Sequence, residues 1–507
     1  MPSAQTAKVT AAADPIDPAA SRNLDAIRTA LGGSQDLIAK EMTLPGDLRT
    51  ALVYIDGLSD NRLIHSTIVE PMQRLKQLPE WPGAAPGTDP LKLLREDVLS
   101  AGDIRPLSDM QNLYDGLLSG NVILLLDGCR EALRIGIPYW EDRSVSEPIS
   151  QPVIRGPMEA FTENIRTNTA LIRRKIKDPR LWLESMQIGT VTKTNVGIMY
   201  VQGLAPDKVT AEVRRRLSAI RIDGVLEGGN IEEFIQDRTQ TPFATVFNSE
   251  RPDAIAAGLL EGRVAILVDG TPFVLLVPAL FTQFFQSAED YAQRADIGSL
   301  LRILRFLCLF IALLAPAFYV AITTFHQEML PTSLLINLAA QREGVPFPAF
   351  IEALMMEITY EILREAGVRM PRPVGQAISI VGTLVIGQAA VEAGIVSAAM
   401  VIIVSITAIS SFVIPNVSMS ISVRMIRFLL MGLAASFGLY GIMIGILTLV
   451  LHLCSLHSFG VPYMSPIAPF ELDEQKDTLF RIAMPRMRGR PRALAPGNVK
   501  RQRRAKR

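Results

Sequence analysis

Cysteine and histidine are scarce in this chain, and the common catalytic motifs are missing. Three cysteines and four histidines are spread over 507 residues, which is too few and too dispersed for a disulfide framework or a zinc cluster. The sequence has no G-x-x-x-x-G-K-[ST] loop, no G-x-G-x-x-G after a strand, no G-x-S-x-G elbow and no H-E-x-x-H pair. These absences predict no catalytic residue, no cofactor and no metal site, and they argue against an enzyme.

Charge is unevenly distributed along the chain. Acidic and basic residues crowd into about the first 300 and the last 35 positions, while residues 303–456 carry the apolar mass. The N-terminal residues 1–30 have no apolar core and predict a disordered leader, not a signal peptide. The apolar part predicts a multi-pass membrane domain over residues 301–456. The predicted spans lie at about residues 303–325, 377–391, 396–414 and 428–453.

The region before the membrane domain predicts a soluble α/β fold with an internal repeat. Two landmarks each occur twice, in the same order: an apolar strand followed by an Asp at a helix start, and a buried strand followed by an Asp-Gly turn. The four segments are residues 51–72, 117–128, 197–217 and 259–270. We therefore expect two related tandem α/β subdomains, 31–145 and 146–300, with a Pro-rich joint opening the second. Asp127-Gly128 and Asp269-Gly270 are predicted hairpin turns.

Residues 377–414 form an apolar run with a single charge, Glu392. The run is long enough for two membrane helices, and its small residues would allow close helix packing. One interpretation makes Glu392 a buried loop carboxylate that caps a helix N-terminus near residues 393–394. The other places it on a cation path, with Gln388 on the same helix face, because rings of glutamates form cation-selective mouths.

Two further features of the membrane domain are candidate functional elements. Residues 349–367 predict an amphipathic in-plane or re-entrant helix, with Glu357, Glu361 and Glu365 on one face. That acidic face could be solvated at the membrane surface, pair with a neighbouring subunit's arginine or form an acidic vestibule. Gly441 and Gly445 form a G-x-x-x-G pair that would pack helices within one subunit or between subunits.

The C-terminal part, residues 457–507, predicts a basic cytoplasmic tail. Residues 481–507 contain eleven Lys or Arg and no acid. Such a tail suits anionic lipid headgroups, with a disordered solubilising tail as the simpler interpretation. Nucleic acid is not expected as a partner, because no aromatic or groove-reading element accompanies the basic residues. Since the tail and the N-terminal region are both expected in the cytoplasm, the number of spans should be even.

Several motifs, taken together and in order, resemble the A subunits of spore germination receptors, the GerA-type nutrient receptors of endospore-forming bacteria. The resemblance covers about residues 31–470. The motifs are Glu147-Pro148, Arg155-Gly156-Pro157, Phe161-Thr162-Glu163, Thr192-x-Thr194, Glu250-Arg251-Pro252-Asp253, Gly262-Arg263-Val264-Ala265 with Pro272-Phe273, Leu330-Pro331-Thr332-Ser333-Leu334, Arg342-Glu343-Gly344-Val345-Pro346-Phe347-Pro348, Leu363-Arg364-Glu365-Ala366-Gly367 and Ile386-Gly387-Gln388-Ala389-Ala390-Val391.

This resemblance implies a subunit of a three-part receptor in the inner membrane of the spore. Its partners would be a transporter-like B subunit that binds the nutrient and a lipoprotein C subunit. The A subunit would form a homo-oligomeric ring, with a pentamer as one arrangement, that acts as a nutrient-gated cation channel. The alternative is a non-conducting scaffold that assembles the B and C subunits. A secondary transporter fits less well, since about four spans are fewer than such proteins use.

Overall fold

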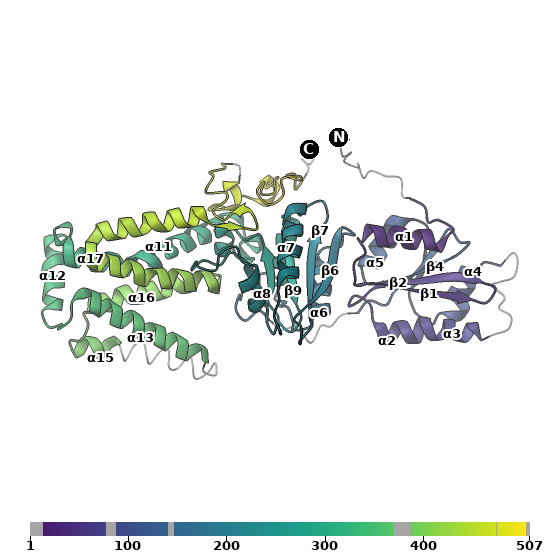
Figure 1. The fold of residues 1–507 in the computed structure, drawn as a ribbon, viewed down its shortest axis with the longest axis horizontal. Helices are drawn as coiled ribbons and strands as arrows, with labels where there is room; N and C mark the ends of the chain where they lie inside the picture. The colour runs from purple at the N-terminus through teal and green to yellow at the C-terminus, as the bar shows by residue number, and fades with distance from the viewer. Residues whose placement is uncertain (1–13, 78–87, 140–146, 370–386, 473, 503–507) are drawn as a thin grey trace.

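The computed structural model describes residues 14–77, 88–139, 147–369, 387–472 and 474–502. Three parts follow one another along the long axis of the molecule (Figure 1): a first α/β subdomain, a second α/β subdomain and a bundle of helices. The N-terminal region thus contains two antiparallel α/β sheets, and the helical region contains the long apolar helices.

Both sheets have five strands and the same topology. The first sheet has the order β1-β2-β4-β5-β3 and the second β6-β7-β9-β10-β8, with every neighbouring pair antiparallel. The strands are β1 (Leu37–Leu44), β2 (Leu48–Ile55), β3 (Ile104–Leu107), β4 (Val122–Leu126), β5 (Ala132–Ile135), β6 (Leu181–Ile188), β7 (Thr194–Val201), β8 (Phe247–Ser249), β9 (Val264–Val268) and β10 (Val274–Val277). The matching orders confirm the internal repeat that the sequence predicts, including the hairpins that follow β4 and β9.

Helices cover both faces of each sheet because strand side chains alternate between faces. In β2, Val53 and Ile55 pack towards one helical layer and Leu52 towards the other. The helices of the first subdomain are α1 (Ala20–Ala30) and α5 (Met110–Leu118) on one face, and α2 (Asn61–Ile64), η1 (His65–Val69), α3 (Glu70–Lys76), α4 (Pro90–Leu93) and η3 (Leu94–Val98) on the other. The second subdomain has α6 (Ile165–Lys175) and α9 (Pro252–Leu260) on one face, and α7 (Asp207–Ala219) and α8 (Gly228–Ile235) on the other.

The predicted disordered leader is wrong from residue 14 onwards, because Ile16 is buried in the first subdomain and helix α1 belongs to the first repeat. Leu24 and Ile27 of α1 are buried against the sheet. The carboxylate of Asp127 accepts a hydrogen bond from the Ala20 backbone N–H at 2.7 Å, and Asp269 does the same for the first residue of α6, Ile165, at 3.1 Å. Each Asp-Gly turn therefore also holds the start of the preceding helix of its repeat. Residues 1–13 lie outside the described part.

A buried ion pair joins the two subdomains. Arg173, with none of its side chain exposed, donates to Asp36 at 2.9 Å and to the Leu181 carbonyl at 3.1 Å. The Trp182 ring N–H donates to the Ala30 carbonyl at 3.1 Å across the same boundary. Removing one member of a fully buried pair leaves an uncompensated charge, so these contacts fix how the subdomains sit on each other.

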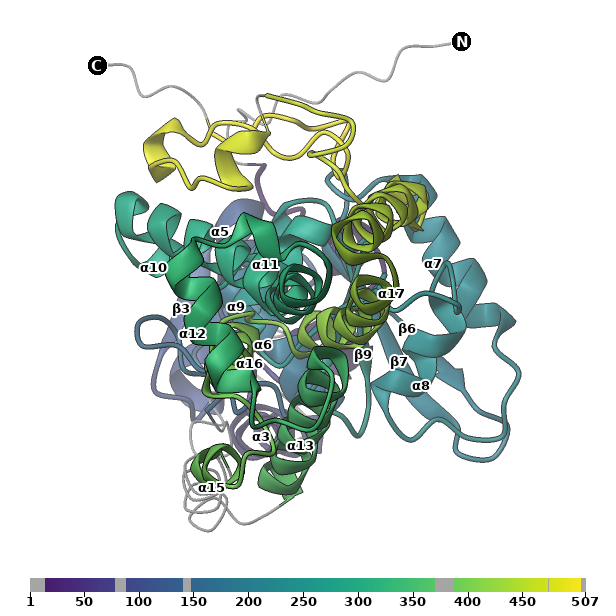
Figure 2. The same cartoon turned by 90° about the vertical axis from the view of Figure 1, so that its left-hand side faces the viewer.

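The helical bundle is built around α11 (Ala295–Phe325), which lies at its centre when viewed along the long axis (Figure 2). Around it lie α12 (Thr332–Arg342), α13 (Ala349–Arg369), α15 (Gly387–Glu392), α16 (Ala398–Phe412) and α17 (Val417–Ser455). Among the described residues, α11 and α17 are long and apolar enough to cross a membrane, and α16 is a shorter apolar helix. The centre of α11 is largely buried, whereas most of α17 faces outward.

Helix α17 folds into a hairpin, so the predicted single span at residues 428–453 is wrong. Gly438 has φ 59° and ψ −138°, a left-handed conformation that glycine adopts without steric cost. A Cβ at this position would lie 2.7 Å from His326, just beyond the far end of α11. At the other end both arms reach the second subdomain, where Ser422 donates to the Pro242 carbonyl and His452 lies 2.8 Å from the Thr241 hydroxyl.

The other predicted membrane elements correspond to the structure to different degrees. The span predicted at 303–325 lies inside α11, and α16 occupies most of the span predicted at 396–414. Residues 377–386 of the predicted span 377–391 lie outside the described part. The amphipathic helix predicted at 349–367 is α13, but it runs lengthwise along the bundle (Figure 1) and does not lie across it. Ion pairs to α17 impose this orientation.

The C-terminal tail is folded where the structure describes it, so the disordered tail is wrong for residues 457–472 and 474–502. It begins with a two-stranded ribbon of β11 (His457–Ser458) and β12 (Val461–Pro462). Tyr463, Leu494 and Ala495 are then buried against the second subdomain and its surroundings. These apolar anchors lie between the basic residues and offset the entropy of ordering the tail.

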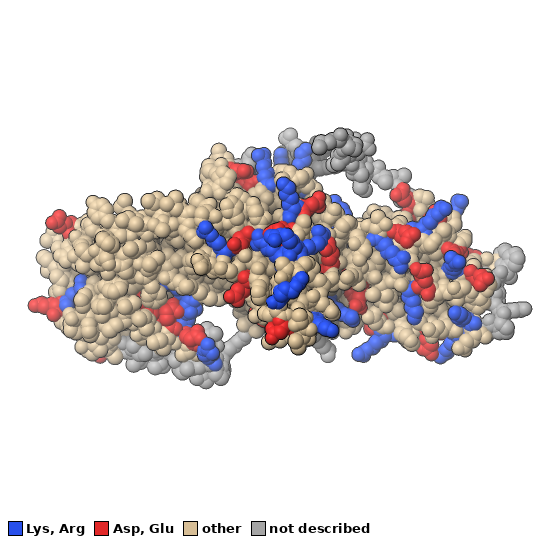
Figure 3. Space-filling view, viewed as in Figure 1, with Lys and Arg blue, Asp and Glu red and all other residues tan. Residues whose placement is uncertain are grey.

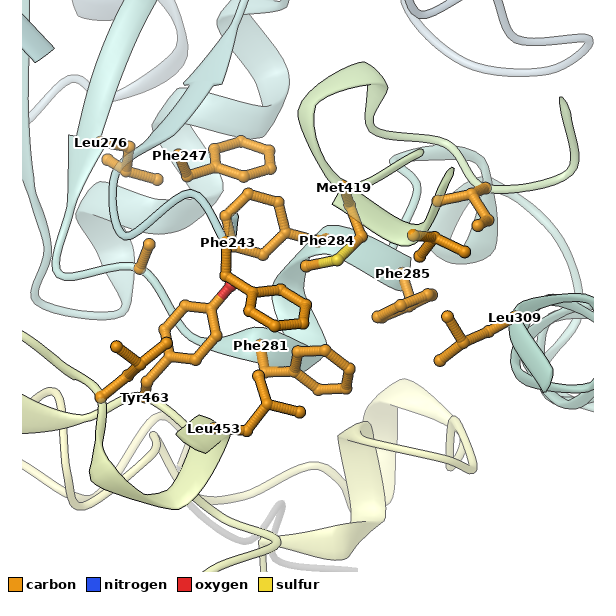
Figure 4. Packing of buried hydrophobic residues seen from close by; sticks show 14 of the residues in the cluster. Phe243, Phe247, Leu276, Phe281, Phe284, Phe285, Leu309, Met419, Leu453 and Tyr463 are labelled. Carbon is orange, nitrogen blue, oxygen red and sulfur yellow. The ribbon is translucent and has the colours of Figure 1, made fainter. Parts of the chain in front are cut away.

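A continuous apolar core connects the second subdomain to the bundle. Phe281, Phe284 and Phe285 gather with Tyr463 between the sheet and the helices (Figure 4). Ring centroids lie 5.1 Å apart for Phe281 and Phe285, and 4.8 Å for Phe285 and Phe306 of α11. Close-packed cores transmit displacement because they contain few voids. The second subdomain and the bundle therefore share one packed core.

Candidate functional site: the acidic face of α13 and the polar end of α15

Helix α13 is inverted relative to an ordinary surface helix. Its carboxylates at Glu352 and Glu357 are fully buried, whereas Ile351, Ile358 and Ile362 are exposed. A helix of a soluble monomer normally turns its apolar stripe inward. The reversed order is typical of a helix whose outer face meets lipid or another subunit and whose inner face carries polar pairs.

The buried face of α13 is neutralised within the same chain. Glu357 pairs with Arg427, and neither side chain is exposed. One helical turn further on, Glu361 accepts from Arg424 at 2.6 Å and from Arg364 at 2.9 Å. The later glutamate, Glu361, pairs with the earlier arginine, Arg424. Helix α13 and the first arm of α17 are therefore antiparallel. Solvation at the membrane surface is therefore wrong for Glu357, and its observed partner comes from this chain.

Exposure increases along α13 towards the soluble subdomains. The exposed fraction of the glutamate side chain is 0% at Glu357, 24% at Glu361 and 58% at Glu365. Within the described part of the chain, the ion-pair partner of Glu365 is Arg369 on its own helix, at 2.6 Å. An exposed i,i+4 pair contributes about 0.3–0.5 kcal/mol, so Glu365 is the member of the acidic face that stays available to solvent or to a partner.

Glu352 is a functional candidate that sequence reasoning missed. Its carboxylate accepts from the backbone N–H of Ser397 at 2.6 Å and from the Ser397 hydroxyl at 2.5 Å. Ser397 is the N-cap of α16 and itself accepts from the Met400 N–H at 3.3 Å. A serine directly before an apolar helix is a recognisable cap signal, but nothing in the sequence links it to a carboxylate 45 residues earlier.

Glu392 does not have the capping role that one interpretation assigned to it. It ends the short helix α15, it is exposed, and its carboxylate accepts from the side-chain amide of Gln388 at 2.8 Å. The turn that follows uses Gly394 with φ 68°, and the start of α16 is held by Glu352 and Ser397. The prediction that Gln388 and Glu392 share one helix face is confirmed by their hydrogen bond, whereas their role on an ion path stays a prediction.

The structure does not bring Gln388 and Glu392 into contact with the α13 glutamates through any hydrogen bond or ion pair among the described residues. Helix α15 lies beneath α13, towards the end of the bundle remote from the soluble subdomains (Figure 1). The candidate residues therefore form two separate polar features: a neutralised face inside the bundle and an exposed pair on its surface.

Gly441 and Gly445 lie where the two arms of α17 meet. A Cβ on Gly441 would be 2.2 Å from the backbone oxygen of Leu433, and one on Gly445 would be 2.4 Å from the side chain of Leu430. Small residues let helix backbones approach closely. The sequence left open whether this pair packs helices within one subunit or between subunits. In the structure, both glycines lie at a contact within one subunit.

The buried polar face retains hydrogen-bonding capacity. Oε1 of Glu357, Oε2 of Glu352, and Nε and Nη2 of Arg427 have no hydrogen-bond partner among the described residues. Buried groups in this condition destabilise a fold by about 1–3 kcal/mol each. In the same part of the chain, no group of three His, Cys, Asp or Glu is placed to hold a metal ion. The ion pairs of this face therefore leave some of its donors and acceptors unsatisfied within the described residues.

Comparisons with known proteins agree across almost the whole chain. The Bacillus/Clostridium GerA spore germination protein family matches residues 25–493. The chain is 49% identical over 489 residues to spore germination protein KA of Bacillus subtilis (strain 168), covering 96% of this chain and 89% of that protein. It is 46% identical to the uncharacterized membrane protein YfkQ of the same organism, covering 96% and 93%.

Among solved structures, a crystal structure of the N-terminal domain of the A subunit of the Bacillus megaterium spore germinant receptor GerK3 matches at 39% identity. The match covers 54% of this chain and 99% of that one, with a TM-score of 0.42.

Proposed function

This chain belongs to the GerA family of spore germination proteins as the A subunit of a germinant receptor, and from that membership we propose that copies of it assemble into a nutrient-gated cation channel in the inner membrane of the spore. The ring would be a homo-oligomer, with a pentamer as one arrangement. The transporter-like B subunit and the lipoprotein C subunit that the family implies would complete the receptor.

A membrane position is supported by the distribution of charge. Few charged side chains interrupt the helical half of the surface, whereas the α/β subdomains are covered with them (Figure 3). Exposed apolar residues continue along α11, α16 and the second arm of α17, among them Phe310, Ile409 and Leu447. A water-soluble monomer rarely exposes apolar patches of this extent. The relative YfkQ is itself named a membrane protein.

The chain returns to its starting side after traversing the bundle. Helix α11 leads away from the second subdomain, and the final arm of α17 ends beside it, so the tail and the α/β region lie at the same end (Figure 1). Because basic segments are retained on the cytoplasmic side and residues 481–507 contain eleven Lys or Arg and no acid, both are assigned to the cytoplasmic side in this proposal. The number of crossings is then even.

The observation that carries the channel proposal is the exposed pair Gln388 and Glu392 on a surface that is otherwise mainly apolar. A carboxylate at membrane depth is costly unless it faces water or a partner. Related copies around an axis would place several such carboxylates in a ring, which attracts cations.

The test is cation flux through purified, reconstituted oligomer. Glu392→Gln removes the charge while keeping the size of the side chain and should lower potassium flux or cation selectivity several-fold. Glu343→Gln is the matched control, because Glu343 is another exposed glutamate of the bundle, at the end of α12. Equal flux and selectivity in Glu392→Gln and the parent protein would refute the role of Glu392.

A non-conducting scaffold is the second candidate, and one specific observation favours it. In α13, the most acidic helix of the bundle, Glu357 and Glu361 form ion pairs with arginines of the same chain. These two carboxylates are therefore unavailable to ions. In this alternative the bundle holds the B and C subunits in place. An intact oligomer in liposomes that passes no cation in any nutrient condition would favour the scaffold over the channel.

A further inference from the structure

The folded tail lines an open cavity that the proposed receptor function does not use. The cavity has a volume of about 580 Å³ and lies between the tail and the turn that joins α9 to β9. The tail is anchored there because the Arg490 Nε–H donates to the Leu260 carbonyl at 2.8 Å. Five arginines line the cavity: Arg486, Arg488, Arg490, Arg492 and Arg501.

These five arginines have no carboxylate partner in the described part of the chain. No ion pair involves any of them, and the hydrogen bonds of Arg490 go to carbonyl and amide oxygens. A guanidinium normally attracts a carboxylate or a phosphate, with which it forms two parallel hydrogen bonds. The cavity therefore concentrates donors that the protein itself leaves unneutralised.

The acidic residues of the cavity wall are already engaged. Glu261 pairs with Arg263 at 3.4 Å, and Asp477 pairs with Arg302 at 2.8 Å. Glu474 accepts from the backbone N–H of Arg492 at 2.5 Å. The five arginines therefore outnumber the three carboxylates of the wall, two of which also pair with arginines outside the cluster, so the wall keeps an excess of positive charge.

Arg490 lies close to other positive charges, which repel its guanidinium. Burial contributes most to lowering the pKa of Arg490, the positive charges of Arg501 and Arg180 lower it further, and the nearby carboxylate of Glu261 offsets part of this effect. A bound anion would remove that repulsion.

The tail lies where the first long apolar helix begins. Arg481 donates to the Gln293 carbonyl at 2.8 Å, and its backbone N–H donates to the Ser299 hydroxyl at 3.1 Å. Gln293 lies two residues before α11, and Ser299 lies in its first turns. Asp477 of the cavity wall pairs with Arg302 of α11, so the cavity lies close to the level at which α11 would enter a membrane, where phosphate groups of lipids are concentrated.

We propose that the tail cavity is a binding site for a phosphate-bearing anion, held by the guanidinium groups of Arg488, Arg490, Arg492 and Arg501. The chemistry is shared by two sources, a free phosphate compound and the headgroup of an anionic phospholipid. The site needs the folded tail, and it does not depend on whether the bundle conducts ions.

The test titrates full-length protein in neutral detergent by isothermal calorimetry, in two arms. One arm uses pyrophosphate, and the other compares short-chain phosphatidylglycerol with phosphatidylcholine of the same chain length. The test variant is Arg488→Gln/Arg492→Gln, since both side chains are exposed and make no side-chain hydrogen bond with a described residue. The matched control is Arg22→Gln/Arg62→Gln, two exposed arginines of the first subdomain.

Binding should weaken about 30-fold in the tail variant, because each basic residue near an anionic surface contributes about 1 kcal/mol. It should also weaken with salt and remain unchanged in the control variant. Loss of pyrophosphate binding would support a free phosphate ligand, and loss of phosphatidylglycerol binding alone would support a lipid headgroup. Equal affinities for the tail and control variants in both arms, or no binding in either arm, would overturn the proposal.

Discussion

Removal of Glu357 should be among the most damaging single changes in the bundle. Its carboxylate and the guanidinium of Arg427 are both fully buried. Glu357→Ala leaves Arg427 as an uncompensated buried charge, which costs about 3–5 kcal/mol of stability. Arg427→Ala should cost about as much, because it strands the carboxylate instead.

The double variant Glu357→Leu/Arg427→Met should lose far less than the two single variants together. Two of the donors of Arg427 and one oxygen of Glu357 already lack partners among the described residues, so the pair is imperfectly compensated. Replacing a buried ion pair by apolar residues of similar volume is often neutral or stabilising. We expect the double variant to stay within about 2 kcal/mol of the parent protein.

The assay is unfolding of the purified protein in mixed detergent with increasing SDS, measured for the parent, both single variants and the double variant. Glu365→Ala/Arg369→Ala is the matched control on the same helix, since that exposed pair should contribute about 0.3–0.5 kcal/mol. Additive losses, with the double variant as unstable as the sum of the two single variants, would refute the antiparallel pairing of α13 and α17.

Three further predictions concern the α17 hairpin, an ion pair on α7 and the buried contact between the two α/β subdomains. Gly438→Ala should destabilise the bundle by about 1–2 kcal/mol because of the positive φ at this position, and the clash with His326 should add to the loss. The control is Gly432→Ala, in open space on the same helix, which should be neutral or stabilising. Thermal melts of the two variants compare these effects. Hydrogen bonding to Arg215 contributes most to lowering the pKa of Glu212 from 4.5 to about 2. Because the folded-state pKa lies below the unfolded one, the stabilisation is present above pH 4.5 and is lost as the pH falls towards 2. In Glu212→Gln, the free energy of unfolding should therefore depend less on pH in that window. Arg173→Ala should cost about 3–5 kcal/mol and speed proteolysis between the two subdomains, and unchanged proteolysis would show that they dock without this contact.

The internal repeat of the α/β region could be predicted because local patterns carry it. An apolar strand before a helix start recurs in residues 51–72 and 197–217, and a buried strand before an Asp-Gly turn recurs in residues 117–128 and 259–270. These four segments contain all or part of β2, β4, β7 and β9, whereas the other strands and their order in each sheet come from the structure. Helix α1 was missed because only a few apolar residues mark its inner face, and its start is held by Asp127 from the far side of the repeat. A cap supplied from 107 residues away leaves no local signal.

The sequence predicted which acidic residues share one face of α13, but not which residues pair with them. The spacing of Glu357, Glu361 and Glu365 places three carboxylates on one helix face whatever surrounds the helix. Which way that face turns depends on arginines that lie 63 and 70 residues later in the chain. Glu352 was overlooked for the same reason, since its significance comes from Ser397.

The sequence by itself determined the repeated α/β architecture, the apolar character of the helical part and membership of the germinant receptor family. These properties depend on periodicity, hydrophobicity and motif order, which short stretches of chain carry. Only the tertiary structure decided that α13 turns its acids inward, that α17 doubles back at Gly438 and that the basic tail folds around a cavity. Each of these depends on contacts between residues far apart in the chain, where charge pairing and close packing select among arrangements that the local sequence permits equally.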